Sequence, residues 1–236
     1  MRRTTSLLLL FFITSFFSYA QNDSNRASHY NWYDGIVGVE NAGLYVGYEY
    51  KDQYRITEEY HKFFQSHDFL IGSLTYNGET YYDQQLKYNV FEDELIIKLR
   101  NKGGETIMQL IKDDLNGFSI NGHYFHRFNH IENDNDSFGF YEILRDYPQF
   151  KLLKKHSKRR IKKLDKNVIY YEYKERKHLY FIVYDNVSYE VRSKKDFLNI
   201  FPEYKEEIKH FNSKSKSTHE VEFTRLSDLI NQLKTQ

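Results

Sequence analysis

The stretch FLIGSLTYNGETYY, residues 69–82, decides the fold class of this chain. Leu70, Leu74 and Tyr76 recur with period two, which is typical of a half-buried β-strand. Asn77-Gly78 then favours a two-residue turn, because both central residues of such a turn must take positive φ. The stretch therefore predicts an antiparallel hairpin with strands at 70–76 and 79–82.

The same pattern recurs on both sides of this hairpin. Strand-like runs bounded by turn residues every 8–12 positions or so are typical of an antiparallel meander. A second Asn-Gly pair at 121–122 predicts a second tight hairpin, and Asp185-Asn186 predicts another turn. We predict further strands at 44–50, 86–91, 95–99, 106–111, 118–120, 123–128, 140–144, 150–153, 168–173, 179–184 and 188–191. The segment 54–64 fits either a strand or a short helix.

The hydrophobic period changes near the C-terminus. Ser193 with Asp196 three residues later forms a capping-box pattern, which predicts the start of a helix. Pro202 ends that helix and opens the next. An apolar stripe at helical spacing then runs through a final helix at Leu226, Leu229, Ile230 and Leu233. The predicted class is α+β, mainly β: an antiparallel β-meander body with about three short C-terminal helices.

The first 20 residues are typical of a secretory signal peptide. Arg2 and Arg3 form a positive start, and an apolar run follows at 7–17. That run is too short to cross a bilayer as a helix, which needs ~20 apolar residues. We predict cleavage after Ala20 and a soluble protein exported to the periplasm or the extracellular space, with no transmembrane span after cleavage.

The formal net charge of +1 conceals a division of charge along the chain. Residues 21–146 hold 11 basic and 21 acidic side chains, whereas residues 147–236 hold 21 basic and 12 acidic ones. The polar stretch ENDNDSFG at 132–139 is the predicted internal boundary. The predicted regions are an acidic antiparallel β region at 21–131, this polar break, a basic antiparallel β region at 140–192 and a helical tail at 193–236.

The composition and the motifs exclude several classes of protein. A chain without cysteine has no disulfide framework, no thiolate metal site and no cysteine nucleophile. A hydrophobic content of 40% is too high for a wholly disordered chain. The sequence lacks G-x-S-x-G, H-E-x-x-H, P-loop and G-x-G-x-x-G patterns. We therefore predict no cofactor and no catalytic residue.

Two neighbouring segments carry potential metal ligands: His123, His126 and His130 in the first, and Asp134 with Asp136 in the second. On the predicted strand, His123 and His126 point to opposite faces. His126 and His130 share a face there but lie roughly 13 Å apart, too far to bind one ion directly. The Asp134 segment lacks the acidic ligands that an EF-hand requires at its fifth and twelfth positions. Ordinary strand histidines and a solvated loop are the alternative interpretations.

Nine basic residues and one acidic residue lie between positions 151 and 166. Such a run is typical of nucleic-acid binding, but the export signal argues against that partner. An anionic lipid, an acidic glycan or an envelope protein is the expected partner of an exported protein. The candidate residues are Lys154, Lys155, Lys158, Arg159, Arg160, Lys162 and Lys163. Alternatively, the run packs against the acidic half of the chain or forms a solvated strand or hairpin.

The chain resembles an uncharacterised family of small exported proteins of Bacteroidota. The resemblance rests on residues 69–95, which include the hairpin quoted above, and on YEVRSKKDFLNIFP at 189–202 with its continuation to Lys209. These motifs are strand, turn and cap signals. The resemblance therefore implies the compartment and the architecture, and it implies no catalytic or binding residues.

Three functions are compatible with these observations. The first is an exported, non-catalytic binding or structural module of the cell envelope. The second is a periplasmic or secreted hydrolase whose carboxylate and histidine groups are assembled by the fold. The third is an adaptor that binds anionic lipid or glycan through residues 151–166. A pocket with convergent Asp, Glu or His would favour the second over the first.

Overall fold

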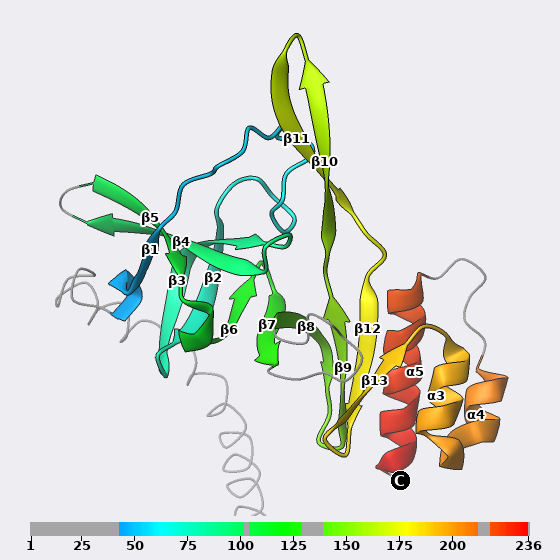
Figure 1. The fold of residues 1–236 in the computed structure, drawn as a ribbon. Coiled ribbons are helices and arrows are strands. Elements are labelled where there is room, and N and C mark those ends of the chain that lie inside the picture. The colour runs from blue at the N-terminus through cyan, green and yellow to red at the C-terminus, as the bar shows by residue number, and fades with distance from the viewer. Residues whose placement is uncertain (1–42, 102–103, 129–138, 212–217, 236) are drawn as a thin grey trace, which may run out of the picture.

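The computed structural model describes residues 43–101, 104–128, 139–211 and 218–235. Within these ranges it confirms the predicted class, a mainly antiparallel β body followed by short C-terminal helices (Figure 1). The predicted signal peptide at 1–20 lies outside the described residues. No helix in the described ranges is long and apolar enough to span a membrane.

Most of the described strands join one antiparallel sheet of 11 strands, in the order β1-β5-β4-β3-β2-β6-β7-β8-β9-β12-β13. Strands β10 and β11 pair only with each other as a separate two-stranded sheet. The strands are β1 (Gly47–Glu49), β2 (Leu70–Tyr76), β3 (Glu79–Asn89), β4 (Glu94–Asn101), β5 (Gly104–Leu110), β6 (Leu115–Ile120), β7 (His123–Phe128), β8 (Gly139–Asp146), β9 (Phe150–Lys155), β10 (Lys158–Asp165), β11 (Val168–Glu175), β12 (Leu179–Tyr184) and β13 (Val187–Val191).

The two predicted Asn-Gly hairpins are confirmed. Asn77 and Gly78 join β2 to β3 with φ values of 52° and 80°. Asn121 and Gly122 join β6 to β7 with φ values of 49° and 79°. Positive φ at both central residues matches the twist of the flanking strands, which is why this dipeptide selects the hairpin.

The N-terminal part of the sheet, β1 to β7, encloses an aromatic-rich core. Leu74, Tyr76 and Tyr88 are buried in it, and the rings of Phe118 and Phe125 stack at 4.8 Å. Alternation along each strand sends these side chains to one face, so the predicted pattern produces the core directly.

The beginning of the described chain differs from the prediction. A strand is predicted at 44–50, but the structure has a 3-10 turn at Gly43–Tyr45 followed by the short strand β1. Leu44 is 1% exposed and turns into the core, which interrupts an extended chain there. The ambiguous segment 54–64 is neither a helix nor a strand and makes isolated bridges through Ile56 and Phe63.

The sheet continues across the predicted break at 132–139. Residues 129–138 lie outside the described ranges, but β7 and β8 on either side of them pair directly, with Phe125 opposite Glu142 and Phe128 opposite Gly139. The acidic and basic regions therefore share one sheet.

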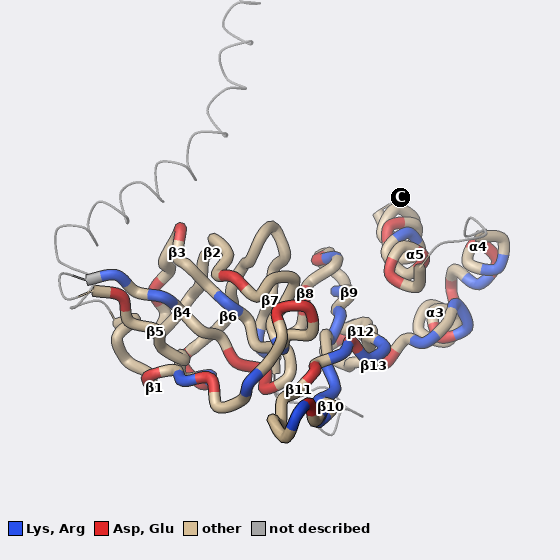
Figure 2. Tube along the Cα trace, turned by 90° about the horizontal axis from the view of Figure 1, so that it is seen from above, with Lys and Arg blue, Asp and Glu red and all other residues tan. Residues whose placement is uncertain are grey.

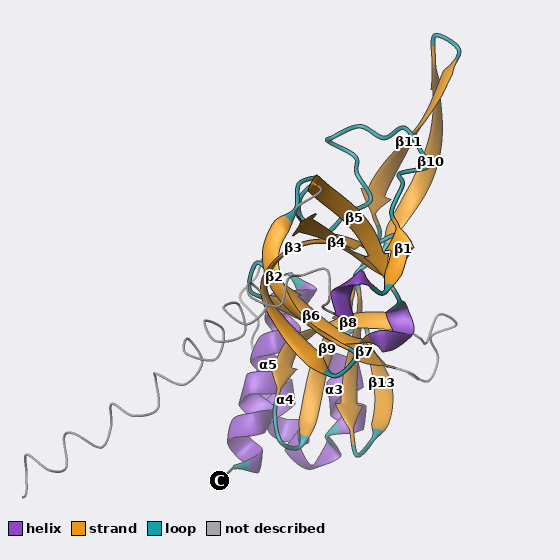
Figure 3. Ribbon diagram, turned by 90° about the vertical axis from the view of Figure 1, so that its left-hand side faces the viewer, coloured by secondary structure: helices purple, strands orange, loops and turns teal. Residues whose placement is uncertain are grey.

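Strands β9 to β12 form one long hairpin whose upper half leaves the sheet. Strand β9 pairs with β12 inside the sheet, whereas their continuations β10 and β11 project beyond it (Figures 1 and 3). His156 and Ser157 separate β9 from β10, and residues 176–178 separate β11 from β12. The chain before β2 runs along the outer edge of β11, where the backbone amide of Tyr171 donates to the carbonyl of Arg55 at 2.9 Å.

Three helices cover the sheet at β9, β12 and β13 (Figure 1). They are α3 (Lys194–Ile200), α4 (Lys205–His210) and α5 (His219–Lys234), with a 3-10 turn at Pro202–Tyr204. The predicted cap is confirmed, because the backbone amide of Ser193 donates to Asp196 Oδ2 at 2.8 Å. Phe150 and Ile182 from the sheet pack with Phe223 and Ile230 of α5 in this second core.

Candidate functional site

The basic run divides into a buried part and an exposed part. Lys154, at 7% exposure, places its Nζ 2.6 Å from Glu220 Oε2 on α5 and 3.8 Å from Glu142 Oε2 on β8. Lys155 places its Nζ 3.0 Å from Asp93 Oδ2. The charges of both lysines are therefore balanced inside the molecule, and neither presents a free ammonium group to a partner.

Asp93 connects the acidic half of the chain to the basic half. It lies in the turn between β3 and β4 and accepts hydrogen bonds from Tyr88 Oη at 2.5 Å and Lys112 Nζ at 2.7 Å. Burial alone raises the pKa of this carboxyl, but the ammonium groups of Lys155 and Lys112 outweigh burial and lower it. At this position an acidic residue of the N-terminal half and a basic residue of the C-terminal half neutralise each other inside the molecule.

Lys158 and Arg160 anchor the base of the β10–β11 hairpin to the chain before β2. Lys158 Nζ donates to the backbone carbonyl oxygens of His61 at 3.0 Å and Phe63 at 2.8 Å. The guanidinium of Arg160 lies 4.7 Å from the ring centroid of Tyr54, within cation–π range. These contacts hold the base of the hairpin in place.

The tip of the hairpin is exposed and partly apolar. All six residues from Leu164 to Ile169 are exposed. Leu164 is 68% exposed, more than any other large hydrophobic side chain in the described ranges, and Val168 and Ile169 are 43% and 46% exposed. Exposed aliphatic side chains gathered at the end of a projecting element mark an interaction surface.

The cations around this tip have few partners. Arg159, Lys162 and Lys166 are exposed, and none of them forms an ion pair with another described residue. Lys163 lies 3.7 Å from Glu172 Oε2 across the hairpin. Seen from above, blue Lys and Arg positions recur along β10 (Figure 2). Residues 158–175 hold seven basic and three acidic side chains, a net charge of +4.

A cavity of about 380 Å³ lies beside the tip, between the hairpin and the chain before β2. Ile56, Val168 and Tyr170 supply apolar lining, and Arg55 and Lys166 are its cationic residues. Asp165 and Thr57 complete the lining. The cavity therefore combines cationic and apolar groups at the exposed end of the molecule.

A second candidate site is a buried cluster of two histidines and a glutamate below the hairpin. His123 Nδ1 lies 2.5 Å from Glu142 Oε1, and His156 Nε2 lies 2.5 Å from Glu142 Oε2. Glu142 and His156 are only 4% and 8% exposed. This cluster could not be predicted from the sequence, since its members come from the start of β7, the middle of β8 and the link between β9 and β10. The one local signal is a charged residue within the apolar strand pattern at 140–144.

The hydrogen bonds of this cluster assign the proton on His123. Asn121 Nδ2 donates to Gln65 Oε1 at 3.0 Å, so the amide nitrogen of Gln65 faces His123 Nε2 at 2.9 Å. His123 Nε2 accepts from that amide, and His123 Nδ1 therefore carries the proton donated to Glu142. Both His123 nitrogens and both Glu142 oxygens thus have partners within the protein.

Electrostatics favours an ionised Glu142 and a neutral His178. Burial opposes ionisation of Glu142, but hydrogen bonds from His156 and His123 lower its pKa to about 2. The ring of His178 lies 4.9 Å from that of His156, and its pKa is lowered mainly by burial and further by Lys154. The cluster is therefore a charged carboxylate enclosed by imidazoles at the start of the projecting hairpin.

The predicted metal ligands do not come together in the described structure. His126 lies on the opposite side of β7 from His123, as strand alternation predicts, and its Nδ1 contacts the backbone oxygen of Arg127 at 2.9 Å. His130, Asp134 and Asp136 lie outside the described residues. Among the residues that the structure describes, no group of three or more His, Cys, Asp or Glu side chains is arranged to hold a metal ion.

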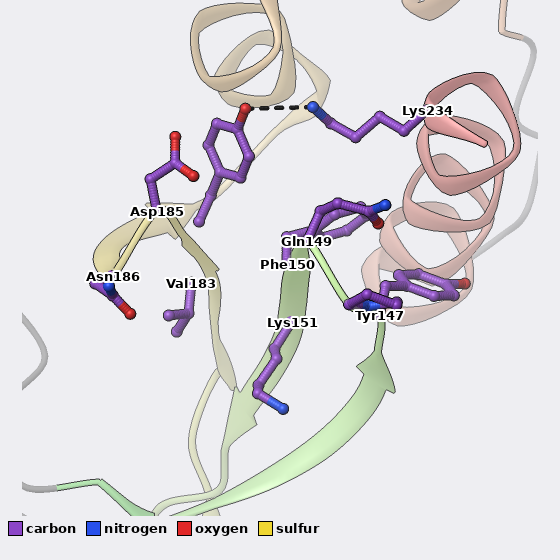
Figure 4. A pocket seen from close by; sticks show the side chains of 10 residues that line it. Tyr147, Gln149, Phe150, Lys151, Val183, Asp185, Asn186 and Lys234 are labelled. Atoms are coloured by element: carbon purple, nitrogen blue, oxygen red, sulfur yellow. Dashed lines mark hydrogen bonds between the residues drawn. The ribbon is translucent and has the colours of Figure 1, made fainter. Parts of the chain in front are cut away.

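Another cavity, of about 410 Å³, lies at the opposite end of the long hairpin (Figure 4). Lys234 reaches it from α5 and donates to Tyr184 Oη at 3.2 Å, and also lies 3.2 Å from Glu203 Oε1. Lys151, its other lysine, pairs with Asp146. Because both cations already have partners, this cavity is a weaker anion site than the hairpin tip.

Comparisons with known proteins add no further assignment: no family model, no curated protein and no solved structure matches the chain.

Proposed function

We propose that this chain is an exported, non-catalytic binding module of the cell envelope and that the β10–β11 hairpin is its docking element. The observation that supports this function is the projecting hairpin itself. Its base is anchored through Lys158 and Arg160, whereas its tip exposes aliphatic side chains and lysines that fill no structural role. A folded protein gains no stability from such a tip, so a binding role accounts for it best.

The export part of the proposal rests on the pattern of the first 20 residues. N-terminal sequencing of the protein recovered from outside the cytoplasm should yield a chain that begins at Gln21. A protein that retains Met1 and remains in the cytoplasm would contradict export.

The docking part is tested by shortening the hairpin. Replacing residues 163–170 by Asn-Gly connects Lys162 to Tyr171, which are paired in the hairpin, and keeps Arg160 at the base. Cells exporting either protein are separated into envelope and soluble fractions. The intact protein should be found in the envelope fraction and the shortened protein in the soluble fraction. Equal distributions of the two proteins would exclude the hairpin as the docking element.

The non-catalytic part is supported by the engagement of both His123 nitrogens within the protein and by the burial of His156, which is only 8% exposed, because a general base needs an unshared nitrogen within reach of a substrate. Its test is hydrolysis of chromogenic esters, glycosides and phosphodiesters by the purified protein and by Glu142→Gln. Both proteins should be inactive. Turnover by the unmodified protein that disappears in a folded Glu142→Gln variant would establish the hydrolase instead.

A further inference from the structure

We infer, on the basis of the proposed function, that the partner of the β10–β11 hairpin is an anionic lipid surface, into which the aliphatic tip inserts while the surrounding lysines bind headgroups. The apolar part of the tip is formed by Leu164, Val168 and Ile169. Leu164 and Ile169 are paired across the hairpin, so both point to one face, and Val168 next to the turn points to the other. Each face of the hairpin thus carries an aliphatic side chain near the turn, which is itself formed by Lys166 and Asn167 beside Asp165.

The aliphatic side chains lie closer to the end of the hairpin than Lys162 and Lys163 do, whereas Lys166, in the turn itself, would reach the headgroup level through its long side chain. Behind the aliphatic end, Lys162 pairs with Tyr171 and Lys163 pairs with Tyr170. Lysine and tyrosine are the side chains that occupy the headgroup level, with the aliphatic groups deeper. Lys162 lies four positions beyond Lys158, which is fixed to the body. This spacing is about 13 Å along the strand, so the tip extends well beyond its anchor.

The chemistry of the tip favours a lipid over an acidic glycan. A glycan is bound by stacking of sugar rings on aromatic faces and by hydrogen bonds, and aliphatic side chains supply neither. Burial of aliphatic surface in a bilayer is favourable, and an anionic leaflet also attracts the lysines. Lys162 and Lys166 need no rearrangement to bind headgroups, since neither is engaged with another described residue.

The cavity beside the tip supplies a place for one headgroup. Arg55 and Lys166 are the cationic groups of its lining, and Val168 and Tyr170 extend the apolar surface of the tip into it. A phosphate held by these two cations would leave its acyl chains beside Val168. This assigns to Arg55, which lies outside the basic run, a role in lipid binding.

The test is co-sedimentation of the full mature chain with vesicles of phosphatidylglycerol and phosphatidylcholine in equal parts, compared with phosphatidylcholine alone. The protein should bind the mixed vesicles only, and binding should weaken as salt is raised. Lys162→Gln with Lys166→Gln should weaken binding by about 30-fold. The matched control, Lys195→Gln with Lys205→Gln, removes two exposed lysines from α3 and α4 and should bind as the unmodified protein does. Equal loss in both pairs would contradict a hairpin-specific site.

Two further variants examine the apolar end and the cavity. Leu164→Ser with Ile169→Ser should weaken binding about tenfold, whereas Val187→Ser with Val221→Ser, which alters exposed valines elsewhere, should not. Arg55→Gln should weaken binding about fivefold. Unchanged binding by the Leu164–Ile169 pair would overturn insertion, and unchanged binding by Arg55→Gln would overturn the headgroup cavity.

Insertion can be observed directly because the chain contains no cysteine. Leu164→Cys and, as a control, Val187→Cys each give a single site for an environment-sensitive fluorophore. Mixed vesicles should shift the emission of the fluorophore at position 164 to the blue and leave that at position 187 unchanged. No shift at either position would exclude insertion.

The lipid inference and the proposed function fail in different ways. If no vesicle binds the protein while envelope fractionation still depends on residues 163–170, the lipid inference is wrong and the hairpin docks to an envelope protein or a glycan. If fractionation does not depend on these residues, the docking function itself is wrong.

Discussion

The lower and upper halves of the β9–β12 hairpin use the same kind of residue in opposite ways. In the lower half, Lys154 is buried against Glu220, and the largely buried Lys155 pairs with Asp93. In the upper half, Lys162 and other cations are exposed with few partners. A run of basic residues is therefore not one functional unit. Its two halves differ because one half lies within the large sheet beside the helices and the other projects from that sheet.

The largest effect on stability is expected from removing the counterion of the lower half of the hairpin. Asp93→Asn keeps a residue that tolerates the φ of 56° at this position but removes the charge that faces Lys155 and Lys112. Lys155, whose side chain is only 12% exposed, then loses the carboxylate that pairs with it, and the free energy of unfolding should fall by about 4 kcal/mol in urea denaturation. Asp165→Asn, the matched change at the tip, should alter it by less than about 0.5 kcal/mol. Similar losses in both variants would refute the contrast.

The second expected effect is a dependence of stability on pH. The pKa of Glu142 is lowered from 4.5 to about 2 in the folded protein, so its stabilising contribution is complete above pH 4.5 and is lost as the pH falls toward 2. The loss should amount to about 3 kcal/mol across that window. Denaturation of Glu142→Gln should lack this window, whereas Glu207→Gln, an exposed change on α4, should keep it.

Protonation of buried histidines should lower the stability at a higher pH than protonation of Glu142 does. The pKa of His61 is lowered to about 4, mainly by burial, and that of His178 is also lowered. The unfolded chain therefore binds protons more readily than the folded one as the pH falls below 6.5, and folding is weakened between pH 6.5 and 4. A stability curve that stays flat through this window would show that neither imidazole is shielded from water.

A smaller effect concerns the boundary between the halves. Lys158→Met keeps the aliphatic stem but removes the donors to the His61 and Phe63 carbonyls. Leaving these oxygens without a partner should cost about 2 kcal/mol. Lys195→Met on the exposed surface of α3 serves as the control and should be neutral. A neutral Lys158→Met would mean that the base of the hairpin is not anchored by this side chain.

The smallest effect on stability is expected from removing the exposed lysines of the upper half of the hairpin. Lys162→Gln with Lys166→Gln should change the free energy of unfolding by less than about 0.5 kcal/mol, because neither side chain has a packing or ion-pair role among the described residues. Its circular dichroism spectrum should also be unchanged. A loss above about 1 kcal/mol would show that the tip contributes to the fold.

Local patterns predicted most of the fold. The Asn77-Gly78 and Asn121-Gly122 turns and the Ser193 cap depend on the conformations of adjacent residues, and all three are confirmed. The segment 54–64 could not be predicted, because its conformation depends on the hairpin that it contacts, more than 100 residues later.

The candidate sites were less predictable for the same reason. His123, Glu142 and His156 come from the start of β7, the middle of β8 and the link after β9, and their convergence depends on the register of these three strands. Arg55 likewise joins the tip cavity only because the chain before β2 runs along β11. No spacing of residues in the sequence predicts these tertiary contacts.

By itself the sequence determined most of the strands, the tight turns, the helical tail and the location of the basic run. Each of these depends on the period of apolar residues and on the φ that a few residues accept, which are local properties. Only the tertiary structure decided which lysines of that run are neutralised and which face solvent. That choice depends on burial and on the acids supplied by distant elements, Asp93 and Glu220 among them, because the cost of an unpaired charge is high only where water is excluded.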